Sequence, residues 1–206
     1  MKLVFSGNRS LQRDALYRLI FRGLRGGYSP ILLMGDRSFD FYAFLRARKK
    51  ARIPISLLDT MQFASVVNGH HVRPLIRKSS EFDTQKTFTI FLDFTRHYLD
   101  DTVPEEVRRY MFRRDLEEIG VLEETSRPVF FFEGGTPYPA TIQQELRALL
   151  FQASRIHLEA SERRFIPRKF FLRPSEEKQF FGEDSSCTTY LCEKLAEKWK
   201  PHYKMA

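Results

Sequence analysis

The chain has few cysteines, few glycines for its length and only one tryptophan. Its two cysteines, Cys187 and Cys192, are too few for a disulfide scaffold, and their spacing matches no zinc-ligand pattern. No apolar run approaches the ~20 residues that a membrane-spanning helix requires. The apolar run at residues 3–5 is too short for a secretion signal. We therefore expect a protein of a reducing intracellular compartment, with no membrane partner.

What the chain has in excess is phenylalanine and positive charge. Its 206 residues include 20 Phe, and 34 Lys and Arg against 26 Asp and Glu give a net charge of +8. A hydrophobic content of 42% excludes a disordered chain and is enough for one sizeable core. The charge is compatible with a polyanionic partner such as nucleic acid, and equally with ordinary solvated surface charge.

Short apolar runs alternate with amphipathic patterns along the chain, without internal repeats or low-complexity segments. We predict strands at residues 2–6, 30–34, 55–58, 87–94, 128–132, 155–158 and 165–172. We predict helices at residues 11–21, 41–52, 61–67, 105–119, 142–153 and 190–199, with Gly120 ending the fourth. Apolar strands separated by helices indicate an α/β protein whose mostly parallel sheet is covered on both faces, with a late antiparallel strand pair. The core domain is expected at residues 1–174, followed by a polar segment and short helix at 175–206.

Three of the predicted strands end in a residue that is suggestive of a ligand site. Gly7, Asp36 and Asp93 follow the first, second and central strands. Ligands of open α/β sheets lie outside the carboxyl ends of the strands. An acidic residue that ends a buried apolar strand, as in residues 89–93, is typical of metal binding in nucleotide-binding sheets.

The turn after the first strand matches a phosphate-binding loop only in part. Against the pattern G-x-x-x-x-G-K-[ST], Gly7 is present, but Gln12, Arg13 and Asp14 fill the other signature positions. Gln12 places a side chain where a phosphate approaches the backbone, and Asp14 places negative charge where a hydroxyl would bind magnesium. An arginine does not reproduce the geometry of the lysine. Residues 35–42 fit the pattern less well.

The order of elements over residues 2–173 resembles the ATPase core of the RecA/Rad recombinase family, most closely a small, degenerate Rad-type recombinase paralogue. The resemblance is carried by residues 7–16 as an altered Walker A, 32–39, 90–93 as a Walker B, 115–120, 128–132 and 153–158. It implies a RecA-like fold of the P-loop NTPase type. It places Asp36 where the family's acidic residue polarises the attacking water.

The altered Walker A implies a pseudo-ATPase without a cofactor. The degenerate nucleotide site would comprise Gly7, Gln12, Arg13, Asp14, Asp36 and Asp93. The resemblance implies a non-catalytic subunit that forms a heterodimer with another recombinase paralogue. This complex would assist recombinase filaments on single-stranded DNA in homologous recombination and DNA repair. We expect it in the nucleus of a eukaryote, or otherwise in the cytoplasm.

Two basic stretches are candidates for nucleic-acid contact. The first contains Arg46, Arg48, Lys49, Lys50 and Arg52, and its alternative is a solvated helix end whose cations complement the helix dipole. The second interleaves aromatic residues with Arg163, Arg164, Arg168, Lys169 and Arg173. That pattern is expected of a single-strand-binding platform. It is equally expected of an edge hairpin whose outward charges prevent aggregation.

Four residues are candidates for partner binding. Phe44 and Ala47 fit the short Phe-x-x-Ala form through which, by the resemblance, recombinase subunits dock, although Phe44 lies on the apolar face of a helix, which favours core packing. Phe170 and Phe171 lie outside the central strands, where an interface is a plausible use. His70, His71 and His157 have no ligand partners at metal-binding spacing.

Two other functions remain open from the sequence. One is a protein that binds single-stranded nucleic acid directly through its basic stretches. The other is a weak nucleotide-binding ATPase with an unconventional loop.

Overall fold

The computed structural model describes residues 2–35, 39–81, 86–124, 128–134, 141–154, 156–161 and 164–170. These residues form one sheet with the strand order β3-β2-β4-β5-β1-β6-β7. The strands are β1 (Lys2–Gly7), β2 (Ser29–Gly35), β3 (Gln62–Val66), β4 (Thr87–Leu92), β5 (Val129–Gly134), β6 (Ile156–Ser161) and β7 (Arg164–Phe170). Neighbouring strands from β3 to β6 are parallel, and β7 runs antiparallel to β6.

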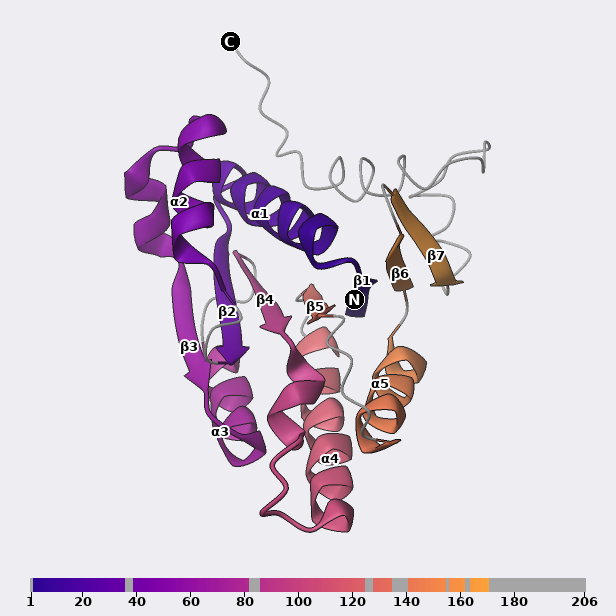
Figure 1. The fold of residues 1–206 in the computed structure, drawn as a ribbon. Coiled ribbons are helices and arrows are strands. Elements are labelled where there is room, and N and C mark those ends of the chain that lie inside the picture. Colours follow the sequence, from indigo (N-terminus) through magenta and orange to yellow (C-terminus); the bar gives the residue numbers. More distant parts are fainter. Residues whose placement is uncertain are drawn as a thin grey trace.

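Helices cover both faces of this sheet (Figure 1), which confirms the predicted α/β class with a parallel sheet. They are α1 (Arg9–Arg25), α2 (Phe41–Lys50), α3 (Gly69–Ser80), α4 (Glu105–Glu124) and α5 (Thr141–Ala153), with short 3₁₀ helices η1 (Ile55–Thr60) and η2 (Phe94–Tyr98). The first two α-helices pack on one face, and the other three pack on the opposite face.

The core accounts for much of the phenylalanine. Every residue of β4 and β5 is buried, as the continuous apolar runs predict, and successive side chains alternate between the two faces. Phe5 stacks on Phe132 with ring centroids 4.6 Å apart on the α1 side. Phe91 stacks on Phe131 at 5.1 Å on the α4 side. The two aromatic layers hold the central strands between the helices.

The predictions for residues 55–67 were wrong. The expected strand at 55–58 is the 3₁₀ helix η1, and the expected helix at 61–67 is the strand β3. The five residues of β3 pair in parallel with β2, with Ala64 and Val66 turned toward the α3 side. Periodicity cannot separate a strand from a helix in so short a run, and the open edge of β2 decided the outcome.

The predicted end of a helix at Gly120 was also wrong. The helix α4 continues to Glu124 because Ile119 and Leu122, on either side of the glycine, are both buried against the sheet. Likewise the first helix was predicted to end at residue 21, before Gly23, but α1 runs through Gly23 and stops at Gly26. A methyl group on Gly23 would lie 2.4 Å from Cε1 of the buried Phe88 ring. Tertiary packing therefore overrides the helix-ending preference of both glycines.

These two helical glycines should respond oppositely to alanine. Gly23→Ala forces the Phe88 ring to move and should lower the free energy of unfolding by about 1–3 kcal/mol. At Gly120 the nearest atom to an added Cβ is Lys2 Nζ at 3.7 Å, so Gly120→Ala should stabilise by up to about 1 kcal/mol through helix propensity. Urea denaturation of the three proteins measures both changes. Equal effects of the two substitutions would contradict the packing at Gly23.

Candidate functional site

A cavity of about 430 Å³ lies at the carboxyl ends of the central strands. Its apolar wall includes Leu16 and Phe132. Its polar side chains come from α1, the residue before α2, and the segment after β4: Arg9, Ser10, Gln12, Arg13, Tyr17, Asp40, Asp93 and Arg96. Three arginines and two carboxylates thus border one cavity at the edge where α/β proteins bind ligands.

Backbone donors of the turn from β1 into α1 are hydrogen-bonded within the turn itself. Gly7 has φ +93°, a conformation that favours glycine. The side chain of Asn8 caps α1, and its Oδ1 accepts hydrogen bonds from Ser10 N at 2.9 Å and Leu11 N at 3.2 Å. Backbone N–H groups at a helix start are those that would otherwise bind an anion. Two of these donors are committed to Asn8.

Gln12 fills the inside of this turn. Its side chain is buried, and Nε2 donates to Gly7 O at 2.9 Å and to Glu133 O at 3.0 Å. Both amide hydrogens are therefore used within the protein. The side chain ties the end of β1 to the end of β5, which lies next to it in the sheet.

Asp93 links the end of β4 to the end of β5. Its backbone is left-handed, with φ +51°, and its Oδ1 accepts a hydrogen bond from Gly134 N at 2.6 Å. Its Oδ2 lies 4.0 Å from Nη2 of Arg9, a largely exposed side chain. A Cβ on Gly134 would stand 2.6 Å from Asp93 Oδ1 and 2.9 Å from Arg9 Nε, so a larger residue there would have to displace both side chains.

Glu133 is a buried acid of this region that none of the sequence motifs indicated. Its carboxylate accepts hydrogen bonds from Thr95 Oγ1 at 2.6 Å and Thr95 N at 3.2 Å. Arg147 Nε lies 4.0 Å away, and the same guanidinium donates to Gly134 O. Burial raises the pKa of Glu133 to about 7. The sequence feature that could have indicated Glu133 is its place directly after the apolar run 129–132.

The structure brings together part of the predicted nucleotide site. Gln12, Arg13 and Asp93 line the cavity, and Gly7 contributes the carbonyl that Gln12 binds. Asp14 is exposed on α1 and is not one of the described side chains that line the cavity. Asp36 lies outside the described residues.

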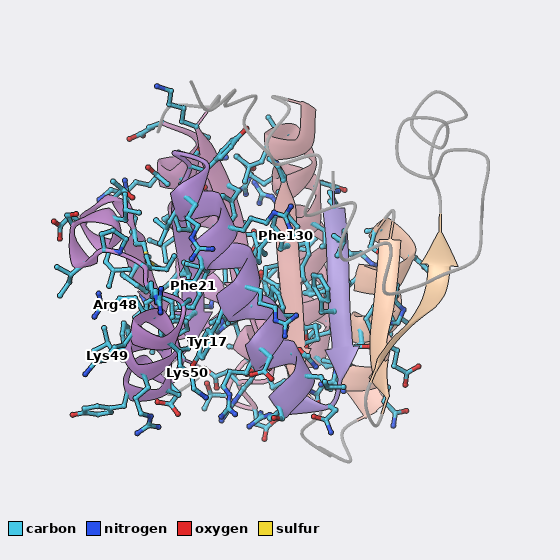
Figure 2. All side chains as sticks on the ribbon, turned by 90° about the horizontal axis from the view of Figure 1, so that it is seen from above. Tyr17, Phe21, Arg48, Lys49, Lys50 and Phe130 are labelled. Atoms are coloured by element: carbon cyan, nitrogen blue, oxygen red, sulfur yellow. The ribbon has the colours of Figure 1, made fainter. Side chains whose placement is uncertain are left out.

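The first basic stretch lies on and just after α2. Arg46, Lys49, Lys50 and Arg52 are exposed, whereas Arg48 is half-buried and donates from Nη1 to Ile53 O at 2.8 Å. Figure 2 shows Lys49 on the side of α2 that is remote from Phe130 in the central sheet. Four of the five cations are therefore available to solvent.

The second basic stretch is described only in part. The backbones of Arg164, Arg168, Lys169 and Phe170 belong to β7. The other candidates of this stretch, Arg163, Phe171 and Arg173, lie outside the described residues, as does the segment 175–206.

Phe44 belongs to the core. It is 2% exposed, and its ring lies 5.2 Å from that of Phe21 and 5.4 Å from that of Tyr17 (Figure 2 labels the last two). Ala47 is partly buried against the same cluster. This burial favours the core-packing interpretation of the Phe-x-x-Ala segment.

Neither a protein-family model nor a curated protein matches the chain. Within the described ranges, no group of three or more His, Cys, Asp or Glu side chains is placed to hold a metal ion. No described helix is long and apolar enough to cross a membrane. Fold and site together define an α/β protein with a mainly parallel sheet and an arginine-lined cavity at the carboxyl edge of its strands.

Gln12→Ala should destabilise the protein by about 1–3 kcal/mol, since it leaves the carbonyls of Gly7 and Glu133 without their side-chain donor. Asp14→Ala, on the exposed side of the same helix, is the matched control and should change stability little. Chemical denaturation of both variants measures the difference. A loss for Gln12→Ala no larger than that for Asp14→Ala would contradict a bridging role for Gln12.

Glu133 should make stability fall as pH rises from about 4.5 to about 7, the interval between its ordinary and its raised pKa. In this window the folded protein keeps a proton that the unfolded chain releases, so rising pH favours unfolding. Above pH 7 both states are ionised and this contribution is constant. Glu133→Gln removes the titration, and urea midpoints from pH 4 to 8 should show a weaker pH dependence than wild type. Identical pH profiles would exclude this contribution.

Proposed function

We propose that this chain is a non-catalytic recombinase-paralogue subunit with a RecA-like core. It pairs with another paralogue and stabilises or remodels recombinase filaments on single-stranded DNA. The observation that carries the proposal is the turn between β1 and α1, whose interior is filled by Gln12. The turn keeps the position of a phosphate loop while its polar groups bind one another.

The arrangement around the cavity supports descent from a nucleotide-binding sheet. The altered Walker A segment, residues 7–16, and the Walker B-like Asp93 adjoin the same cavity, although 76 residues lie between them in sequence. They meet because β5 lies between β1 and β4, so that both strand ends reach the same edge. This is the placement that the resemblance implies for the two motifs.

The residues of this site do not fit a magnesium nucleotide. Asn8 holds two of the backbone donors at the start of α1, and Gln12 occupies the space inside the turn. Asp14 replaces the hydroxyl residue that would bind magnesium, and Asp93 Oδ1 already accepts from Gly134. A phosphate would have to displace internal hydrogen bonds and would gain no lysine in return. These features support a subunit that acts by binding and leaves ATP hydrolysis to its partners.

The resemblance implies that the chain assists DNA repair by homologous recombination. The nucleus is the proposed compartment if the protein is eukaryotic. In that role the retained fold serves as an interaction surface in a heterodimer. Direct binding of single-stranded nucleic acid is the second candidate function. It is favoured by the exposed cations of α2, Arg46, Lys49 and Lys50.

The purified chain should hydrolyse ATP with magnesium no faster than a buffer blank. Arg13→Ala, at the rim of the cavity, should leave that background unchanged because no phosphate is held there. The readout is phosphate release, measured at a protein concentration high enough that hydrolysis by the chain itself would exceed hydrolysis by any contaminant. Hydrolysis that Arg13→Ala abolished would overturn the non-catalytic assignment.

Partner identity is tested by co-purification from the native source followed by mass spectrometry. The proposal expects at least one recombinase-family protein in stoichiometric amount. Purification of a stable complex that contains no such protein would contradict the proposed role.

A further inference from the structure

The outer face of α2 exposes aromatic and aliphatic side chains. Tyr42 is 81% exposed, Phe41 is 45% exposed, and Leu45 one turn later is also exposed. The ring of Phe63, from the neighbouring strand β3, lies 5.2 Å from that of Phe41 and is exposed as well. We call the three aromatic residues together with Leu45 the aromatic face. Grouped apolar exposure of this kind on a folded protein marks an interaction site.

The helical period explains why these side chains point outward. Phe44 turns toward the sheet, and Ala43 and Ala47 flank it against the core. At 3.6 residues per turn, this orientation places Tyr42 and Leu45 on the opposite side of the helix. Tyr42 and Leu45 thus lie outside the buried face of α2, whereas the half-exposed Phe41 also packs against the core ring of Phe39 at 4.8 Å.

Exposed cations lie on the same side of α2 as Tyr42 and Leu45. Arg46 follows Tyr42 by four residues, and Lys49 follows Leu45 by four, so each cation neighbours an exposed apolar side chain. Lys50 and Arg52 extend the positive charge past the last turn. We call Arg46, Lys49, Lys50 and Arg52 the basic end of α2.

The segment that carries the basic end has no acidic residue of its own. Residues 41–58 contain five cations and no acid, and none of the four exposed cations forms an ion pair within the described part of the chain. Elsewhere the protein does pair such groups: Arg73 and Arg77 both bind Glu118, at 3.0 and 2.9 Å. Positive charge beside exposed rings therefore complements a partner that is itself anionic, and it opposes self-association of two copies through this face.

We propose that the aromatic face and the basic end of α2 form a binding site for single-stranded nucleic acid. Unpaired bases stack on Tyr42 and Phe41, and phosphates lie against Arg46, Lys49 and Lys50. A single strand is favoured over a duplex because only unpaired bases present their ring faces. The site comprises residues of α2, Arg52 just after that helix and Phe63 of β3, whereas the cavity lies between α1, the residues just before α2 and the ends of β4 and β5. The inference rests on the second candidate function, direct binding of single-stranded nucleic acid, and does not depend on the proposed role with recombinases.

Fluorescence anisotropy of a labelled oligo-dT strand titrated with the full chain tests this site. Wild type should bind at low salt, and Tyr42→Ala should weaken binding by about tenfold through loss of one stacked base. Tyr42→Trp, which keeps a stacking ring, should restore the affinity. The matched control is Tyr110→Ala, since Tyr110 is 60% exposed on α4 at the opposite face of the sheet and should leave binding unchanged.

Salt titration tests whether these cations neutralise phosphates. The double substitution Lys49→Gln with Lys50→Gln should reduce the slope of log affinity against log salt by about 0.7 for each phosphate that is no longer neutralised. Lys78→Gln with Arg113→Gln removes two exposed cations from the other face and should keep the wild-type slope.

Three results would overturn the proposal. The first is no binding of the isolated chain to oligo-dT at low salt. The second is equal binding by Tyr42→Ala and Tyr110→Ala, which would assign any affinity to charge elsewhere. The third is self-association that Tyr42→Ala abolishes in the absence of DNA, which would make this face a protein interface. A failure here leaves the hydrolysis test of the proposed function unaffected, so the two outcomes are distinguishable.

Discussion

The end of β5 is the point on which the carboxyl edge of the sheet depends. Glu133 O accepts from Gln12 of α1, Gly134 N donates to Asp93 after β4, and Gly134 O accepts from Arg147 of α5. One strand end thus fixes three elements that approach it from both faces. Because β5 lies between β4 and β1, the shape of the cavity follows from these contacts.

Side chains of the protein itself also hold the turn between β1 and α1 at this edge. In a phosphate-binding loop the donors of the turn await an anion, whereas here Asn8 and Gln12 supply internal partners for the turn. These internal hydrogen bonds stabilise the turn. Among the described side chains, one buried donor nearby, Arg147 Nε, has no hydrogen-bond partner. The exposed cations of α2, Arg46, Lys49 and Lys50, lie outside the cavity. The proposals for the two regions differ accordingly: the turn beside the cavity is held by internal hydrogen bonds, and the exposed face of α2 is open to a partner.

The sequence was informative where one signal was strong. The uninterrupted apolar runs of β4 and β5 predicted buried parallel strands, and the strand-end position of Asp93 placed it beside the cavity. The sequence predicted the structure poorly where two signals competed. Residues 55–67 are too short for periodicity to decide, and at Gly120 the burial of Ile119 and Leu122 outweighed a local helix-ending preference. Local preferences are small compared with the burial of a large side chain, so tertiary contacts decide such cases.

The sequence by itself determined the α/β class, the residues that end the strands and the mismatch of Gln12, Arg13 and Asp14 to a phosphate loop. These properties are local, since each depends on residue type and spacing within one segment. Only the tertiary structure decided that Gln12 bonds to β5, that Glu133 is a buried acid with a raised pKa, and that α2 turns its aromatic face outward. Those properties depend on strand order and on packing between segments far apart in the chain, which no local pattern specifies.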